Sequence, residues 1–275
     1  METRINLSEI ALLTTVANFD LYKKTRPYQP AGIRKLVIDG REGMYGLDSL
    51  LYTFEKLPLE DIKWLILADE DVLFLENNAL LEIIKEMDSA NYTVAGIRDG
   101  GTMPNRRHNP YVPNTFFCIL DFQAISGIYY RKEIQEQQFI NADEFREDLA
   151  GLKVGFDRTS LYEPYYRFFL WLKRKDYKFL FLKADLLDPD TDELSTEVYG
   201  LNKKRILIHT WYARAYGKNE TQTKRIDAIL EAYAPSSNSK PNEAEIYKDH
   251  FYKYKLGFRK LRRRVQTKFG KCFDY

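Results

Sequence analysis

Cysteine is scarce in this chain of 275 residues, which contains two cysteines, Cys118 and Cys272. They lie far apart in very different surroundings, so the sequence indicates neither a disulfide framework nor a zinc site. We therefore expect a cytoplasmic protein in a reducing compartment. The N-terminus lacks the basic and then apolar pattern of a signal peptide, and no apolar run approaches the length of a membrane-spanning helix.

An excess of charge of one sign is also missing, since 42 Lys and Arg stand against 40 Asp and Glu. This balance gives no sign of a polyelectrolyte partner, and we expect no nucleic acid partner. The sequences G-x-G-x-x-G and G-x-x-x-x-G-K-[ST] are absent as well, which removes the main support for a dinucleotide site or a P-loop. What the chain does have is a hydrophobic content of 44%, enough for a sizeable core.

Strands and helices are predicted to alternate along the first hundred residues, which favours a doubly wound nucleotide-binding half. Apolar runs predict strands at 10–16, 36–38, 64–68 and 94–97, and helical spacing predicts helices at 47–56 and 80–87. Pro27 and Pro30 argue against a long helix between them and the first strand. The same patterns predict later strands at 114–121, 178–182 and 206–208, and later helices at 134–152, 161–175 and 226–233.

The expected organisation is one α/β domain followed by a tail. The domain covers residues 1–234, with a nucleotide-binding half at about 8–113 and an acceptor half at 114–234. A Ser-, Asn- and Pro-rich linker is predicted at 235–243. A basic, aromatic helical extension is predicted at 244–275.

The chain is organised around a buried strand that ends in three acids, Asp69-Glu70-Asp71. Crowded acids repel one another and are tolerated where a cation neutralises them, and hard oxygen ligands suit Mg²⁺ or Mn²⁺. Ligands of open α/β sheets also bind at the carboxyl ends of strands. Alternate residues of an extended segment point oppositely, so Glu70 is expected to point away from the other two. The alternative is a solvated turn whose acids cap the next helix.

A late strand at 206–208 ends in His209, and a carboxylate pair joined by a distant imidazole is a reasonable shell for a divalent metal. Such a metal would bridge two phosphates and neutralise the charge on a departing diphosphate. The alternative for His209 is a buried histidine whose hydrogen bonds are satisfied.

With these motifs in this order, the sequence resembles the GT-A class of nucleotide-sugar glycosyltransferases, whose hallmark is an Asp-x-Asp motif at this place in the fold. The resemblance covers roughly residues 8 to 215. It implies a GT-A-like doubly wound mixed sheet, with a Rossmann-like nucleotide-binding half and an acceptor half. It also implies a divalent metal, Mn²⁺ or Mg²⁺, held by Asp71 and His209, with Asp69 touching the metal or the ribose.

The resemblance further implies the residues that contact the nucleotide sugar. The strand that begins at Asn114 resembles the strand that glycogenin-like enzymes place against the donor sugar, with Phe116 where a glycine is usual. The remaining nucleotide contacts lie at the ends of the first three strands and are Thr14, Thr15, Ala17, Asn18, Asp39, Ala68 and Asp69.

The acceptor side is represented by Asp157, which occupies the place where many members of the class put an acid facing the acceptor. Asp157 would take the proton of the acceptor hydroxyl, and Glu163 could substitute for it. The competing interpretation of Asp157 is a helix N-cap, because Thr159 and Ser160 follow it.

The function implied is the metal-dependent transfer of a sugar from a nucleotide-diphosphate donor, such as a UDP-sugar, to a glycan or lipid-linked acceptor. Bacterial surface polysaccharide synthesis is the expected setting. Two alternatives remain open: a nucleotidyltransferase acting on sugar phosphates, and a non-catalytic protein that binds sugar nucleotides.

The basic tail carries Phe258, Leu261, Val265 and Phe269 on one helical face and cations elsewhere. This is the pattern of an interfacial helix on an anionic membrane, and nucleic-acid binding is the alternative. The tail would place the protein peripherally on the cytoplasmic membrane, where it could meet a lipid-linked acceptor.

Overall fold

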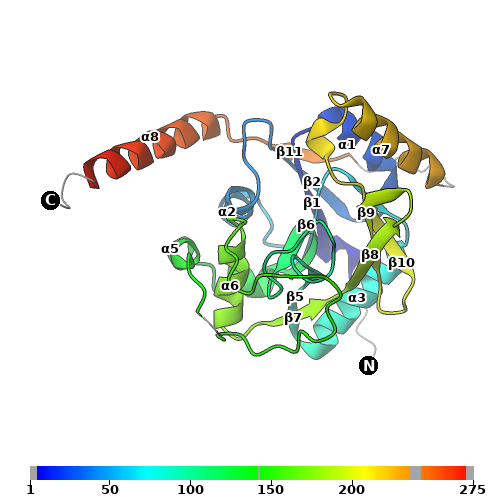
Figure 1. Ribbon diagram of the computed structural model, residues 1–275, viewed down its shortest axis with the longest axis horizontal. Coiled ribbons are helices and arrows are strands. Elements are labelled where there is room, and N and C mark those ends of the chain that lie inside the picture. Colours follow the sequence, from blue (N-terminus) through cyan, green and yellow to red (C-terminus); the bar gives the residue numbers. More distant parts are fainter. Residues whose placement is uncertain (1–4, 142, 236–242, 271–275) are drawn as a thin grey trace.

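The computed structural model describes residues 5–141, 143–235 and 243–270, of which 263–270 are described by their backbone alone. Two sheets form the framework (Figure 1): a mixed, mostly parallel sheet of seven strands and an antiparallel sheet of four. The predicted α/β fold with a mixed sheet is thereby confirmed. The order of the larger sheet is β11-β2-β1-β3-β6-β5-β7.

The centre of the larger sheet is formed by parallel strands whose carboxyl ends lie at one edge. Residues of β3 alternate between the two faces and are buried on both, with Leu65 in one hydrophobic core and Ile66 in the other. Complete burial of such a side chain contributes about 2–3 kcal/mol relative to exposure. The strands on this side are β1 (Ile10–Val16), β2 (Arg34–Asp39) and β3 (Trp64–Ala68).

The other half of this sheet reverses direction, because β6 runs antiparallel to both β3 and β5. The edge strand β7 is parallel to β5. Register pairs Ala68 of β3 with Phe117 of β6, which sets the start of β6 beside the end of β3. The strands of this half are β5 (Tyr92–Arg98), β6 (Pro113–Asp121) and β7 (Lys178–Phe181).

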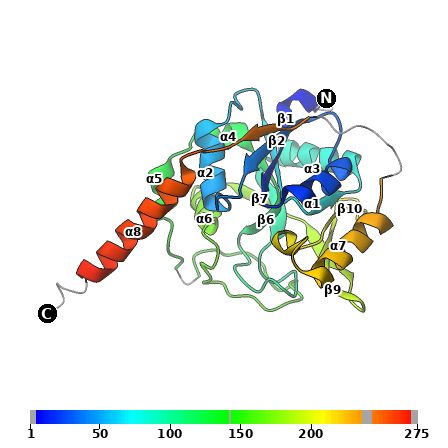
Figure 2. The ribbon, with the colours of Figure 1, turned by 90° about the horizontal axis from the view of Figure 1, so that it is seen from above.

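Helices cover both faces of the larger sheet (Figure 2), with α2 and α6 on one face and α3 on the other. Two further helices, α1 and α7, pack on the smaller sheet through a separate apolar cluster. The longer helices are α1 (Phe19–Thr25), α2 (Leu47–Lys56), α3 (Asn77–Ala90), α6 (Tyr166–Arg174) and α7 (Glu220–Ala232). Shorter helical segments are α4 (Phe122–Ser126), α5 (Arg131–Glu136) and the 3-10 turns Leu7–Glu9, Arg26–Tyr28 and Ala213–Ala215.

The smaller sheet contains three strands that the sequence patterns did not predict. One is only three residues long, and the other two carry polar residues at half or more of their positions, so none of the three shows a long apolar run. Its order is β4-β10-β9-β8. The strands are β4 (Val72–Phe74), β8 (Lys183–Asp188), β9 (Asp192–Tyr199) and β10 (Arg205–His209).

The helix predicted over 134–152 is wrong. The helix α5 ends at Glu136, and the chain then runs without regular secondary structure over its described residues until α6. Apolar residues in this stretch do not follow a helical spacing and pack individually on the core. The segment is fastened by side chains instead, since Arg174 binds Glu144 and Lys173 pairs with Glu147.

The C-terminal segment first adds an edge strand to the larger sheet and then continues away from the sheet as a helix. Strand β11 (Glu245–Tyr247) pairs in parallel with β2, and α8 (Tyr252–Gly270) follows. Most of the predicted linker, residues 236–242, lies outside the described residues. Among the described helices, none combines the length and the apolar character needed to cross a membrane.

Candidate metal and nucleotide site

Asp69, Asp71 and His209 come together at the carboxyl end of β3. One ligand atom from each side chain can be chosen so that the three atoms lie within 4.8 Å of one another. The imidazole Nε2 of His209 lies 3.1 Å from Oδ1 of Asp71, and both side chains are only 2% exposed. Strand pairing produces this contact, because β4 follows the acids directly and places Val72 opposite His209 in β10.

The imidazole of His209 packs against two aromatic rings. Phe116 stacks on it with a centroid distance of 4.3 Å and an interplanar angle of 10°, and Trp211 lies 4.2 Å away. The indole of Trp211 is fixed in turn, because its Nε1 donates to Oγ1 of Thr196 at 2.9 Å. The ring orientation of His209 is therefore set by packing.

Two buried atoms of the cluster have no hydrogen-bond partner within the described part of the chain: Oδ2 of Asp71 and Nδ1 of His209. A buried polar atom without a partner carries a desolvation cost of about 1–3 kcal/mol. Carboxylate oxygens and an imidazole nitrogen are also ligands that divalent metals accept. The cluster thus fits a divalent cation, which would give these atoms partners.

The burial and crowding of the acids also favour a bound cation. Burial raises the pKa of Asp69 to about 7, and the neighbouring charges of Asp71 and Glu70 act in the same direction. Burial also raises the pKa of Glu70 to about 7, with Asp71 again contributing. A cation held by Asp69 and Asp71 would favour the ionised form of Asp69.

Glu70 has a role that the sequence patterns did not indicate. Its Oε1 accepts hydrogen bonds from the backbone N–H groups of Ala17 and Asn18 at 3.0 and 3.1 Å. Its backbone carbonyl accepts a hydrogen bond from the hydroxyl of Thr25. Its carboxylate therefore points to the loop after β1, away from the group formed by Asp69, Asp71 and His209. The middle acid binds this loop to the end of β3.

Asn18 continues this connection toward the other side of the site. Its side chain caps α1 by accepting from the N–H of Leu21, and its Nδ2 donates to the carbonyls of Ala213 and Tyr216 at 2.8 and 2.9 Å. The loop after β1 is thus joined to the segment that follows His209. Both the oxygen and the nitrogen of its amide are hydrogen-bonded, so Asn18 supports the site and does not line the cavity.

A cavity of about 620 Å³ opens beside the cluster, within the range of small-molecule sites. Four residues predicted to contact the nucleotide line it, namely Thr15, Ala17, Ala68 and Asp69. The hydroxyls of Thr15 and Ser49 are hydrogen-bonded to each other at its wall. Its remaining lining comes from the β2–α2 loop, α2, the start of β6 and residues 209–215: Gly40, Tyr45, Gly46, Ser49, Thr115, Trp211, Tyr212, Ala213, Arg214 and Ala215, together with Leu13, Leu50, Leu67, Glu70, Asp71 and His209.

The segment after β10 supplies Arg214, which sequence reasoning missed. The guanidinium of Arg214 lies 4.1 Å from the ring centroid of Tyr45, and both residues line the cavity. Trp211 and Tyr212 have φ values of +60° and +63°, which bulky residues rarely adopt. Arg225 of α7 stabilises this turn by donating to the carbonyls of Thr210 and Trp211.

Asp39 lies at the end of β2, where it was predicted, but its carboxylate is already paired. Arg41 donates to it from Nε and Nη2 at 2.9 and 2.6 Å, and Nζ of Lys248 lies 3.8 Å away. The Arg41 contact is the largest influence on this carboxyl and lowers its pKa. Gly40, the next residue, lines the cavity in its place.

Thr14 and Asn114 are buried and do not line the cavity. Nδ2 of Asn114 donates to Asp99 at 2.6 Å, and Oδ1 of Asn114 accepts from the N–H of Phe116. Asp99 is the centre of a buried network that also includes Arg106, Tyr165 and Tyr166, and Thr115 lines the cavity instead of Asn114.

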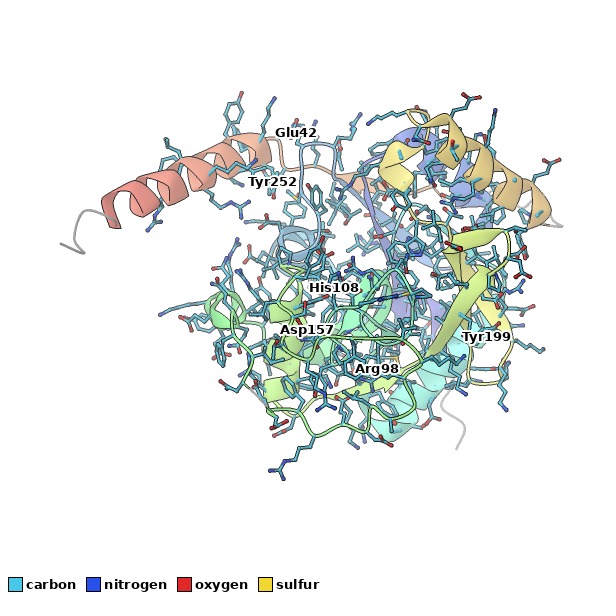
Figure 3. All side chains as sticks on the ribbon, in the orientation of Figure 1. Glu42, Arg98, His108, Asp157, Tyr199 and Tyr252 are labelled. Carbon is cyan, nitrogen blue, oxygen red and sulfur yellow. The ribbon has the colours of Figure 1, made fainter. Side chains whose placement is uncertain are left out.

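The two acids predicted on the acceptor side do not line this cavity either. Asp157 is exposed, and hydrogen bonds from the hydroxyl and the N–H of Thr159 lower its pKa. It holds a turn and does not cap a helix, because the next helix, α6, begins at Tyr166. Its backbone N–H donates to the carbonyl of His108, which lies near it in Figure 3. Glu163 is bound to Arg106 at 3.0 Å and belongs to the surroundings of Asp99.

Two comparisons with known proteins give no relative. No protein-family model matches the sequence, and no curated protein matches it.

Proposed function

We propose that this chain is a metal-dependent glycosyltransferase of the GT-A type, which takes a sugar from a nucleotide-diphosphate donor such as a UDP-sugar. The observation that carries this proposal is the cluster of Asp69, Asp71 and His209 at the rim of a 620 Å³ cavity. The cavity lies at the carboxyl ends of parallel strands, where nucleotides bind in open α/β sheets. A glycan or a lipid-linked molecule is the acceptor that we propose.

The lining suits a nucleotide diphosphate. Arg214 offers a cation for a phosphate oxygen, Tyr45 offers a ring face for a base or sugar, and Thr15 with Ser49 offers hydroxyls. A guanidinium and a bound cation that line one cavity can share the negative charge of a diphosphate. The alternation of aromatic and polar groups is that of a small-molecule site.

In the proposed mechanism, Asp71, His209 and Asp69 hold a divalent cation, Mn²⁺ or Mg²⁺. Such a cation supplies positive charge that stabilises the departing diphosphate. Arg214 adds positive charge, and Trp211 and Tyr212 line the cavity. An acceptor hydroxyl would attack the anomeric carbon as the bond to the diphosphate breaks. Asp157 does not line the cavity, so we do not assign it as the base that takes the proton.

The loop after β1 argues against a nucleotidyltransferase. Such an enzyme would need a glycine-rich, basic loop here, with free backbone N–H groups to bind phosphates. In this chain the N–H groups of Ala17 and Asn18 are already bound to Glu70.

The test is thermal unfolding with UDP, UDP-glucose and UDP-galactose, each with and without Mn²⁺. A ligand at about 100 times its Kd stabilises the native state by about 2.7 kcal/mol, so binding raises the Tm. We expect a rise that needs Mn²⁺, that Asp71→Asn abolishes, and that the exposed control Asp61→Asn retains.

Catalysis is tested separately from binding by following Mn²⁺-dependent hydrolysis of the UDP-sugar that binds. Binding without hydrolysis or transfer would favour the non-catalytic alternative. An Asp71→Asn variant that retains the full Tm rise would contradict the proposal.

A further inference from the structure

Helix α8 projects from the body of the protein (Figures 1 and 2) but is clamped at its base. The hydroxyl of Tyr252 donates to Asp48 of α2, and the guanidinium of Arg259 binds the same carboxylate at 2.8 and 2.9 Å. Leu256, between them, packs on the core that contains α2. We call Tyr252, Leu256 and Arg259 the inner face of α8. It makes the first turns of α8 a fixed continuation of the domain, and Figure 3 shows Tyr252 at this junction.

The opposite side of α8 carries three large exposed side chains, Tyr254, Phe258 and Leu261, which we call the outer face. They are 75%, 69% and 57% exposed. Each follows an inner-face residue by two positions, which turns it by about 200° around the helix. The outer face is therefore an apolar strip that points away from the domain and also lines a surface hollow with Lys253 and Gly257.

Positive charge surrounds this strip. Residues 252–270 contain eight Lys and Arg and no Asp or Glu. Of the cations whose side chains are described, Lys253, Lys255, Lys260 and Arg262 are exposed, and Lys255 pairs with Asp249. A strip of exposed apolar residues among cations is complementary to a partner with a negatively charged surface and an apolar interior.

We propose that α8 is a membrane arm, which lies on an anionic lipid surface through Tyr254, Phe258 and Leu261. The three side chains would enter the boundary between head groups and acyl chains, while Lys253, Lys260 and Arg262 pair with anionic head groups. Charge complementarity selects this occupant. Two copies meeting through these helices would bring sixteen cations of residues 252–270 together, twice the eight of one chain.

The experiment is co-sedimentation of the full chain with vesicles of phosphatidylcholine, and with vesicles in which phosphatidylglycerol replaces part of it. We expect binding to the anionic vesicles that decreases with salt, because the charge contribution is screened. Replacing three of the exposed cations together (Lys253→Gln, Lys260→Gln, Arg262→Gln) should weaken binding roughly a hundredfold. The double variant Phe258→Ser and Leu261→Ser should also lose binding.

A matched control is Leu201→Ser, which removes an exposed apolar side chain from the turn between β9 and β10. It should bind like the wild type, and circular dichroism should show that every variant is folded. The proposal is overturned if wild type binds neither vesicle, binds both equally, or is unaffected by the outer-face double variant. Light scattering without vesicles is the second readout: a dimer that the double variant converts to a monomer would show that α8 binds a second copy instead. None of these readouts depends on the transferase activity.

Discussion

Oε1 of Glu70 accepts the backbone N–H of Ala17 at 3.0 Å, across 53 positions of sequence. The acid triplet therefore has two uses: its outer members belong to the candidate metal site, and its middle member holds the loop after β1. That loop is a wall of the cavity, and Asn18 in the same loop reaches the carbonyls of Ala213 and Tyr216. Glu70 thus connects the two sides of the proposed donor site.

The first prediction concerns this connection. Glu70→Ala leaves two backbone N–H groups without their acceptor and should lower the free energy of unfolding by about 2–4 kcal/mol. Glu70→Gln keeps an acceptor oxygen in the same place and should cost clearly less. Urea unfolding of both variants measures the difference, and equal losses would show that the hydrogen bonds of Glu70 contribute little.

The second prediction concerns the support of His209. Arg225 binds the carbonyls of Thr210 and Trp211, so Arg225→Met should loosen the residues directly after the proposed ligand. Loss of such outer support typically lowers metal affinity by about tenfold to a hundredfold. Calorimetric titration with Mn²⁺ gives the Kd. Lys224→Met, on the exposed side of α7, should leave the Kd unchanged, and an unchanged Kd in Arg225→Met would refute the supporting role.

The third prediction concerns Arg214 and Tyr45, whose stacked side chains line the cavity. Arg214→Ala should weaken UDP binding in the presence of Mn²⁺ by roughly tenfold or more, because a charge-assisted hydrogen bond contributes about 1.5–3 kcal/mol. Tyr45→Ala should have a smaller effect. The double variant should lose less than the sum of the two losses, because the side chains are in contact. Additive losses would show that the two residues bind the nucleotide independently, and no loss in Arg214→Ala would place the phosphates elsewhere.

The fourth prediction is a pH dependence of stability that arises far from the cavity. Burial lowers the pKa of Lys35 from 10.5 to about 7, and its Nζ donates to the carbonyl of Pro30. The unfolded chain binds a proton here over a range where the folded chain does not. The free energy of unfolding should therefore rise with pH between about 7 and about 10, by up to about 1.4 kcal/mol per pH unit.

Lys35→Met removes this titration, so its stability should depend less steeply on pH than that of the wild type. Urea unfolding at several pH values in this range gives both slopes. Lys85→Met, at an exposed position of α3, should retain the wild-type slope. Identical slopes in Lys35→Met and wild type would mean that Lys35 is charged in the folded protein.

Much of the framework is encoded locally in the sequence. Strands such as β3 and β6 are buried on both faces and appear as continuous apolar runs, and α2 shows its helical spacing from Leu47 onward. The acids of the triplet were recognisable because three charges follow a buried strand at once. These features depend on short-range periodicity, which can be recognised within a short window of sequence.

The assembly of the site depends on tertiary pairing. The contact of His209 with Asp71 joins positions 138 residues apart, and it depends on the register of β4, a strand of three residues with no pattern of its own. The attachment of Glu70 to the loop after β1, and of Arg225 to the turn after β10, likewise depends on where separate elements meet in space. The sequence by itself determined the alternating strands and helices and the acids at the end of β3, because burial periodicity is local. Only the tertiary structure decided which side chains complete the cluster and which merely support it, because strand register and side-chain packing are properties of the whole chain.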